Sequence, residues 1–511
     1  MSTDAPEQSP SASHSSLPRQ VRRGISWNLV GAVSTNAMRL LVVVVLGRVL
    51  SSRDFGIVAA ALSVIAIMHM VRDLGIGPAL IQRKALEPGH IATAFAMSTY
   101  LGIGLAVIIV ISAPLVGDLY HSPQCVSLLR ALAVIFVFRG VAMTSQMLCQ
   151  RAMNFRAVAL IDTLSYAAGS ITSMVLAGIG AGPWSLVAGY LVEEGLSTVV
   201  FLAMYRPRIT LRVERDKLRH LLGFGAGQTI FQLASVIATQ GDNVIVGHSM
   251  GPTKLGYYTR AYDLIKLPGA VFTNLVGNVL FPAFSRLQGD PERLGAAFRR
   301  MTFVNALILL PASAVLIVVA PEAIRILMGP RWNDAVLPFQ ILALSMMMRV
   351  SYKVGVVVAN AAGAVYGLAI VNIIYAGFVI GGAALMVPYG IPGIAGSTAV
   401  SIGLMYVLCS WLGMKHCTLG WRAFGAAHVP GLIAGVVIGA AAWPLAEALR
   451  DANVLGPIRL VVIAAVGAIL TLAMVGWWTR RGNGDFGWLR GELGVVTKRL
   501  RRKPKPQAAG G

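Results

Sequence analysis

The sequence predicts an all-α, polytopic membrane protein with about fourteen transmembrane helices, and three observations support this prediction. Of the 511 residues, 56% are hydrophobic and only 13% are charged, and the mean hydropathy is +0.71. A soluble chain of this size would need far more charged residues to cover its surface. Apolar runs of about 20 residues, each long enough to cross roughly 30 Å of hydrocarbon, recur along almost the whole chain. A transmembrane β-barrel is excluded, because its strands would alternate apolar and polar residues in segments of about 10.

Hydropathy divides the predicted helices into two sets of six and a final pair. The first set is expected at roughly 26–48, 55–79, 91–116, 127–149, 157–179 and 182–204. The second set is expected at roughly 221–247, 256–283, 302–324, 335–360, 364–387 and 391–413, and the final pair at roughly 428–449 and 457–478. We therefore expect a disordered cytoplasmic tail (1–20), an N-lobe (21–205), a C-lobe (206–415), two extra helices (416–480) and a basic amphipathic tail (481–511). The two six-helix lobes should be pseudo-symmetric and surround a central cavity.

The distribution of positive charge predicts the orientation of the chain. The formal net charge is +22, yet about 28 of the 43 Lys and Arg residues fall in predicted cytoplasmic segments and about 9 in external loops. This positive-inside pattern predicts a cytoplasmic (inner) membrane protein with both termini in the cytoplasm, and it explains the net charge without a nucleic-acid partner.

The C-terminal tail contains an amphipathic pattern. Asp485 is a suitable N-cap for a helical stripe formed by Phe486, Leu489, Leu493, Val496 and Leu500. Two interpretations remain open: the helix lies on the anionic cytoplasmic leaflet, or the tail is solvated.

An internal repeat occurs at an offset of 200 residues. The run 44–47 (VVLG) aligns with 244–247 (VIVG), and Phe55-Gly56 aligns with Leu255-Gly256. In each half, a helix ends on Gly and the next helix opens on Gly nine residues later. Because each half has an even number of spans, both halves enter the membrane with the same orientation, which is typical of a two-lobed alternating-access transporter.

Several basic residues fall at predicted bilayer depth, where charge is costly and usually faces a bundle interior or a wet cavity. They are Arg39, Arg72, Arg139, Lys266, Arg349 and Lys353. For Arg72 and Arg139, an internal ion pair is the competing interpretation. No acidic residue lies within one turn of Arg39, and Arg349 and Lys353 stack four residues apart without a local acid. An anion such as phosphate or pyrophosphate would compensate such residues, so Arg39, Lys266, Arg349 and Lys353 are predicted to bind the substrate. Arg72 joins the predicted substrate-binding residues only through the family resemblance described below. Interfacial snorkelling is the competing interpretation, especially for Lys353.

Acidic residues at similar depth are Asp73, Asp162, Glu193, Glu194, Asp242 and Asp263. Asp263 precedes Lys266 by three positions, so the two side chains should share a helical face. We interpret Asp73, Asp242 and Asp263 as candidate ion-binding or gating residues.

The sequence offers no sign of an enzyme, a metal site or a cofactor. The four cysteines have neither CxxC nor zinc spacing, the eight histidines form no metal motif, and no P-loop or nucleophile elbow is present. A driving force would therefore come from an ion gradient, the membrane potential or consumption of the cargo.

Four stretches resemble a known family. These are residues 50–59 (LSSRDFGIVA), 73–83 (DLGIGPALIQR), 242–258 and 281–288 (FPAFSRLQ), and they are similar to Wzx-type polysaccharide exporters, in particular the colanic-acid or exopolysaccharide branch of the multidrug/oligosaccharidyl-lipid/polysaccharide superfamily. The resemblance covers roughly residues 20–415.

The resemblance implies that the chain moves undecaprenyl-pyrophosphate-linked oligosaccharide units to the outer leaflet for exopolysaccharide or lipopolysaccharide synthesis. Expected partners are this lipid-linked substrate, membrane lipids and other polysaccharide-assembly proteins. By analogy with relatives that move lipid-linked peptidoglycan precursor, Arg39, Arg72 and Lys266 occupy similar positions, with Arg260 as the alternative to Lys266. A cation-coupled drug antiporter of the same superfamily, and a membrane polymerase or ligase, are the alternatives.

Overall fold

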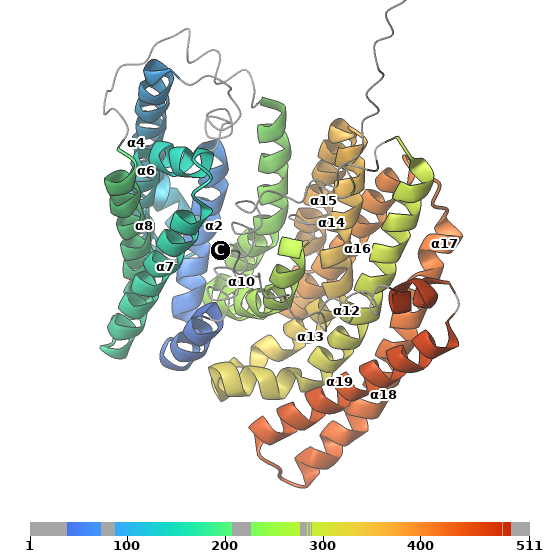
Figure 1. The fold of residues 1–511 in the computed structure, drawn as a ribbon. Helices are drawn as coiled ribbons and strands as arrows, with labels where there is room; N and C mark the ends of the chain where they lie inside the picture. Colours follow the sequence, from blue (N-terminus) through green and yellow to red (C-terminus); the bar gives the residue numbers. More distant parts are fainter. Residues whose placement is uncertain are drawn as a thin grey trace, which may run out of the picture.

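The computed structural model describes residues 38–72, 87–206, 226–275, 284, 287, 289–482 and 484–491. For residues 71–72, 226–234, 267–275 and 365 the description is limited to the backbone. All regular elements in these ranges are helices, arranged as two bundles with an additional helix pair beside the second bundle (Figure 1).

The N-lobe is an antiparallel bundle. Its helices are a segment over 38–49, α2 (Ser52–Arg72), α4 (Pro88–Leu119), α5 (Pro123–Leu132), α6 (Val134–Arg151), α7 (Phe155–Gly178) and α8 (Pro183–Met204). Proline opens α4, α5 and α8, where its missing N–H costs no intrahelical hydrogen bond. Asn154 caps α7 by accepting a hydrogen bond from the amide nitrogen of Ala157 at 3.2 Å.

The C-lobe begins with one long broken helix. Its elements are α10 (Ala226–Leu275), α12 (Pro291–Met328), η2 (Pro330–Ala335), α13 (Val336–Leu344), α14 (Met346–Ala361), α15 (Val365–Leu385), η3 (Val387–Tyr389) and α16 (Gly390–Met414). Gly251 has φ 79° and interrupts α10, and Pro252 then opens the second part. The two parts of α10 occupy the positions of the predicted spans 221–247 and 256–283.

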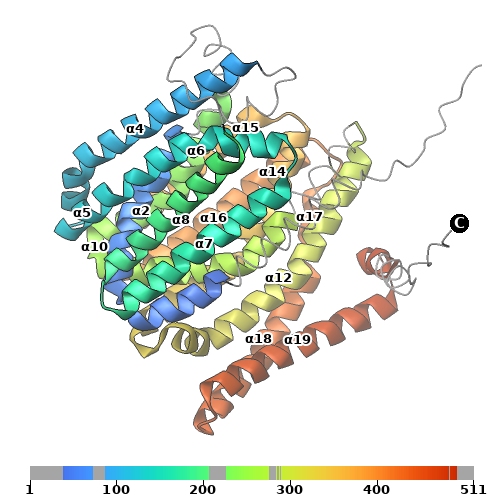
Figure 2. The same ribbon diagram turned by 60° about the vertical axis from the view of Figure 1, so that its left-hand side comes forward.

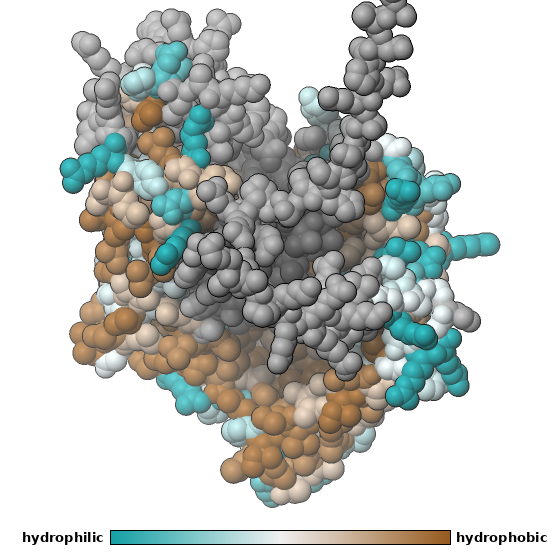
Figure 3. Space-filling model, viewed as in Figure 1, coloured by the Kyte–Doolittle hydropathy of each residue, from teal (hydrophilic) through white to brown (hydrophobic). Residues whose placement is uncertain are grey.

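The predicted membrane fold is confirmed. Among the described residues, ten spans are long and apolar enough to cross a membrane, or eleven if the bent pair Pro330–Leu344 and Met346–Ala361 is one span. The segment 38–49 and the two parts of α10 account for the other predicted spans. Figure 3 shows apolar side chains over the outer surface of the N-lobe and over α18 and α19, as expected for surfaces in contact with lipid.

Helix α12 is much longer than its predicted span of roughly 302–324. Its 38 residues correspond to about 57 Å at 1.5 Å per residue, well beyond the hydrocarbon thickness. The additional first turns carry Glu292, Arg293, Arg299 and Arg300. Hydropathy detects only the apolar part of a helix, so it could not predict this polar extension.

The two extra helices pack against α12 on the side away from the N-lobe (Figures 1 and 2). They are α18 (Val429–Asp451), preceded by the short α17 (Trp421–Ala426), and α19 (Gly456–Arg481). Glu322 of α12 is buried and lies 2.8 Å from Nε of Arg450 on α18 and 3.8 Å from Nη1 of Arg459 on α19. A buried carboxylate needs such partners, so this ion cluster fixes α18 and α19 to the C-lobe.

The first residues of the apolar stripe in the C-terminal tail pack against α12. The Phe486 ring lies 4.9 Å from the Phe303 ring, and Leu489 packs in the same cluster. Asp485 pairs with Arg299 at 2.7 Å. This turn of the predicted amphipathic helix therefore docks on α12, while Leu493, Val496 and Leu500 lie outside the described residues.

The two lobes meet at the repeated glycines. A β-carbon added at Gly56 would overlap the carbonyl oxygen of Pro252, and one added at Gly256 would overlap the carbonyl oxygen of Ser52. The same imagined carbons would lie 3.0 Å from the Gly256 nitrogen and 3.2 Å from the Gly56 nitrogen. Since Ser52 and Pro252 are also 200 residues apart, the contact is symmetric, and the repeat inferred from the sequence is a structural two-fold relation between lobes.

Polar contacts next to Gly47 and Gly247 follow the same two-fold relation between the lobes. Arg48 donates to the carbonyl oxygen of Ile326, on α12, at 2.6 Å. His248, the repeat partner of Arg48, places Nδ1 2.7 Å from the carbonyl oxygen of Leu119, at the end of α4. Each lobe therefore contacts the third helix of the other through equivalent positions.

Trp332 fills the lobe interface at one side of this crossing. Its indole is fully buried and donates to the carbonyl oxygen of Gly47 at 2.9 Å. Its ring packs edge-on against Phe55 of the N-lobe at 5.5 Å and Tyr257 of the C-lobe at 5.6 Å. One apolar core thus runs through both lobes at this end of the molecule.

Replacing Gly256 by Ala should loosen the lobe contact without unfolding either lobe, because the clash is relieved by separating them. Overpacking costs about 1–3 kcal/mol, which corresponds to a roughly 5- to 150-fold shift away from the closed contact. The measurement is cross-linking of His121→Cys with His248→Cys, whose native rings lie 5.5 Å apart, by a short bismaleimide in a chain whose native cysteines are replaced by alanine. Gly104→Ala is the control, because nothing lies within 4 Å of its added carbon. Equal cross-linking yields in the two variants would contradict the prediction.

Candidate functional site

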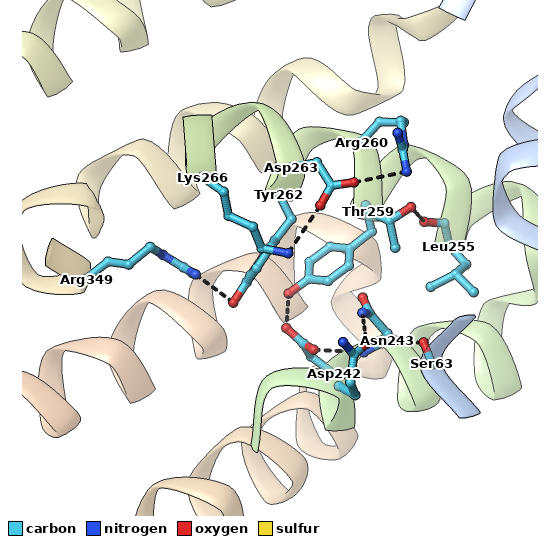
Figure 4. A network of polar contacts seen from close by, with 12 residues as sticks. Ser63, Asp242, Asn243, Leu255, Thr259, Arg260, Tyr262, Asp263, Lys266 and Arg349 are labelled. Atoms are coloured by element: carbon cyan, nitrogen blue, oxygen red, sulfur yellow. Dashed lines mark hydrogen bonds and ion pairs between the residues drawn. The ribbon is translucent and has the colours of Figure 1, made fainter. Parts of the chain in front are cut away.

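The candidate site is centred on the two parts of α10, close to the lobe interface (Figure 4). The break at Gly251 turns the chain back, so that Asp242 on the first part lies beside Tyr258 on the second. The second part presents Tyr258, Tyr262 and Lys266 at four-residue spacing, and these side chains therefore lie along one helical face.

Asp263 holds two cations. Its carboxylate lies 2.9 Å from Nη2 of Arg260 and 3.1 Å from Nζ of Lys266, both three residues away. The Lys266 ammonium also lies 4.3 Å from the centre of the Tyr262 ring, and the Arg260 guanidinium lies 4.7 Å from the Phe55 ring of the N-lobe. The expected shared face of Asp263 and Lys266 is confirmed, and one positive charge of this trio remains uncompensated.

Arg39 approaches the same region from the N-lobe. Its side chain is exposed, and its guanidinium lies 5.6 Å from the centre of the Tyr166 ring on α7. Among the described residues Arg39 forms no ion pair within 4 Å, and it lies within electrostatic range of Glu193 of α8 and Asp263 of α10. The structure thus brings Arg39 toward the Arg260–Asp263–Lys266 trio.

Arg349 on α14 is held by tyrosine. Its Nη1 donates to the hydroxyl of Tyr262 at 2.8 Å, and its guanidinium stacks 4.2 Å from the centre of the same ring. The Nε and Nη2 atoms of Arg349 are buried and lack a hydrogen-bond acceptor among the described residues. Lys353 is half-buried one turn further along α14. Arg349 therefore has two N–H groups that are available to donate hydrogen bonds to an anionic ligand.

Asp242 is 2% exposed and is held by neutral donors. It accepts a hydrogen bond from the Tyr258 hydroxyl at 2.7 Å and one from the backbone nitrogen of Asn243 at 2.9 Å. The Thr398 hydroxyl on α16 lies 3.5 Å away. The Tyr258 and Tyr262 rings lie 6.0 Å apart, so a continuous set of polar and aromatic contacts connects Asp242 with Arg349.

The tyrosines were missed by reasoning from charge alone. Tyr258 and Tyr262 are uncharged, so a search for ionised groups at bilayer depth passes over them. Their four-residue spacing with Lys266 was visible in the sequence and would have placed all three on one face. Thr398 offered no such signal, because it lies 156 residues from its partner Asp242.

The side chains of two predicted site residues lie outside the description. Arg72 is the last residue of α2 and only its backbone is described, and Asp73 lies outside the described residues. Their roles stay predictions, as do the binding and gating roles of the other predicted site residues.

Arg139 matches its alternative interpretation as an ion-pair residue. It pairs with Glu194 of α8, with Nε 2.7 Å from Oε2, and the Thr198 hydroxyl donates to the backbone carbonyl of Glu194. The carboxyl groups of Glu193 on α8 and Asp162 on α7 lie near this pair. The basic residues of the site therefore come mainly from the C-lobe, with Arg39 as the N-lobe contribution.

Comparison with protein families identifies the chain. The family described as "Polysaccharide biosynthesis protein" matches residues 45–337, more than half of the sequence. The chain belongs to this family.

Individual relatives of this polysaccharide biosynthesis protein agree with the assignment. It is 26% identical over 338 residues to lipopolysaccharide biosynthesis protein WzxC of Escherichia coli (strain K12), covering 65% of this chain and 68% of that protein. It is 28% identical over 329 residues to succinoglycan biosynthesis transport protein ExoT of Rhizobium meliloti (strain 1021), covering 64% and 66%. The matches span about two thirds of each relative.

Solved structures share the fold. The lipid II flippase MurJ in an inward closed conformation superposes with a TM-score of 0.73 at 15% identity, covering 89% of this chain and 99% of that one. An inward-facing multidrug resistance MATE transporter superposes with a TM-score of 0.58 at 15% identity, covering 78% and 98%. At this identity the likeness establishes the two-lobed fold, and it confirms the predicted architecture.

Replacing Tyr258 by Phe in this family member should destabilise the folded protein. The change removes a hydroxyl donor from a buried carboxylate, and leaving such a group under-satisfied costs about 1–3 kcal/mol. Thermal unfolding of the purified protein measures the effect. Tyr389→Phe is the control, because Tyr389 is 71% exposed. Matching unfolding temperatures for the two variants would show that the Asp242–Tyr258 contact contributes nothing.

Proposed function

We propose that this protein translocates an undecaprenyl-pyrophosphate-linked oligosaccharide repeat unit from the inner to the outer leaflet of the cytoplasmic membrane. The observation that carries the proposal is the set of basic side chains that converge near the lobe interface with too few carboxylates to neutralise them: Arg39, Arg260, Lys266 and Arg349. Arginine forks and a lysine point charge suit a pyrophosphate, and the names of relatives such as ExoT supply the sugar-polymer context.

The two-fold contact between the lobes supports an alternating-access mechanism. The Gly56–Gly256 crossing, Trp332 and the contacts of Arg48 and His248 join the lobes at the helix-1/helix-2 junction and its repeat counterpart. In the predicted orientation, with both termini cytoplasmic, these junctions face the outside. The observed conformation is then closed to the outside, and the outward-open conformation requires these contacts to break.

The ion-coupling role is proposed for Asp242, with Asp263 and Asp73 as further gating residues. Asp242 sits at one end of the contacts that lead through Tyr258 and Tyr262 to Arg349. A cation or proton bound at Asp242 would alter the hydrogen bond that Tyr258 donates to it. Because Tyr258 packs near Tyr262, the change would reach the hydrogen bond between Tyr262 and Arg349. We also propose that Lys353 and Arg72 contact the substrate. Other polysaccharide-assembly proteins are the proposed partners.

A cation-coupled drug antiporter is the second candidate. Asp162 and Glu193 support it, because they add carboxylates to the N-lobe beyond the one neutralised by Arg139. The Arg349 donors and the cation excess around Asp263 favour the anionic lipid. A polymerase or ligase has no supporting feature among the described residues.

Arg39→Ala and Arg349→Ala should each reduce polysaccharide export by about tenfold or more, because a charge-assisted hydrogen bond contributes about 1.5–3 kcal/mol. In cells that depend on the variant, surface polysaccharide and lipid-linked repeat units on the inner side of the membrane are measured together. Export should fall while repeat units accumulate and the amount of inserted protein stays unchanged.

Arg293→Ala is the matched control, because Arg293 is exposed and pairs with Asp290 at the start of α12. Normal export by both test variants at normal expression would refute pyrophosphate binding at these residues. Loss of drug resistance with normal export would instead establish the antiporter.

A further inference from the structure

Helices α7 and α8 leave an open groove on the surface of the N-lobe, away from the basic residues between the lobes. The groove has a volume of about 470 Å³, and its walls are apolar along most of its length. Leu160 and Leu164 line it from α7, and Leu196, Val200 and Met204 from α8. Leu164 is 63% exposed, so the groove opens at the molecular surface.

The face of α7 that lines the groove is opposite to the face near the lobe interface. Leu164 lies two positions from both Asp162 and Tyr166, and Leu160 lies two positions from Asp162. Two positions correspond to about 200° around a helix of 3.6 residues per turn. Tyr166 contacts Arg39, whereas Leu160 and Leu164 point into the groove. The groove is therefore separate from the site proposed for the pyrophosphate.

One end of the groove is basic. Asn154 and Arg156 line it there, and Nδ2 of Asn154 donates to the hydroxyl of Tyr205 at 3.2 Å, which brings the start of α7 to the end of α8. Arg206 follows Tyr205 and is exposed, and Arg151 ends α6 close to Asn154 in the chain. Arg156 thus lines the polar end of an otherwise largely apolar groove, and Arg206 and Arg151 lie next to that end along the chain. In the predicted orientation this end faces the cytoplasm.

We propose that this groove binds an anionic glycerophospholipid, with one acyl chain between α7 and α8 and the phosphate at Arg156 and Arg206. The volume and the apolar lining with a few polar groups at one end are those of a ligand site. An acyl chain needs no hydrogen bonds, so the apolar walls suit it, and basic pockets between membrane helices recognise acidic lipid headgroups. The arginine guanidinium binds a phosphate through two parallel hydrogen bonds.

Charge complementarity distinguishes this site from general contact with the bilayer. A groove filled by any neighbouring lipid would hold zwitterionic and anionic lipids equally. The arginines at one end favour the anionic lipid, since a basic residue near the membrane surface increases its affinity about fivefold. The polyprenyl chain of the proposed substrate is the rival occupant. Its pyrophosphate would lie between the lobes, on the other face of α7.

Native mass spectrometry of the purified full-length protein tests this proposal, with dioleoylphosphatidylglycerol and dioleoylphosphatidylcholine as probes. The wild-type protein should retain phosphatidylglycerol in preference. Arg156→Gln should weaken that retention about fivefold, and Leu164→Trp, which fills the groove, should abolish it.

Two controls match these variants. Arg293→Gln removes an exposed arginine elsewhere, and Val175→Trp places the same large ring on the same face of α7 three turns from the groove. Equal retention of both lipids by the wild type, or equal retention by test and control variants, would overturn the proposal. Retention of undecaprenyl phosphate in preference to phosphatidylglycerol by the wild type, lost in Leu164→Trp, would also overturn it, by assigning the groove to the polyprenyl chain. Polysaccharide export is not measured here, so failure of the proposed translocation would leave this result unchanged.

Discussion

The close approach of two helix backbones at Gly56 and Gly256 determines how the lobes are related. Without side chains at these positions, α2 and the second part of α10 pass so near that each glycine faces a carbonyl oxygen of the other helix. That proximity allows Trp332 to reach the Gly47 carbonyl and Arg48 and His248 to reach the opposite lobes. A larger residue at either glycine would break the contacts of Trp332, Arg48 and His248 at the same time, because packed interfaces do not deform continuously. The closed arrangement of the lobes therefore depends on a contact that can be lost as one unit.

Most basic side chains of the site are stabilised by contacts that do not neutralise their positive charge. Arg349 and Arg39 meet aromatic rings, and Lys266 shares a single carboxylate with Arg260. Cation–π contacts and a tyrosine hydroxyl reduce the cost of partial burial while leaving the positive charge in place. Asp242 shows the complementary solution, since hydroxyl and amide donors hold its carboxylate without a cation at ion-pair distance among the described residues. The site therefore keeps a positive potential for a ligand, in contrast to Arg139 and Glu194, which satisfy one another.

The sequence allowed the fold to be predicted more completely than the site. Long apolar runs placed the spans, and the glycines at an offset of 200 predicted which residues would meet across the two-fold relation. Local spacing also predicted the Asp263–Lys266 pair. Pairing between distant helices could not be predicted, because nothing in a single sequence connects Arg349 with Tyr262 or Glu322 with Arg450. The polar first turns of α12 were missed because hydropathy measures apolar length rather than helix length.

The ion cluster of Glu322 with Arg450 and Arg459 determines which helices move together with the C-lobe. Because α18 and α19 are fixed to α12, and Phe486 and Asp485 are docked on the same helix, everything described after α16 belongs mechanically to the C-lobe. The two halves are thus unequal in size, and α18 and α19 move together with the C-lobe when the lobes turn about a shared axis. A fluorophore attached near residue 491 would report the heavier body alone.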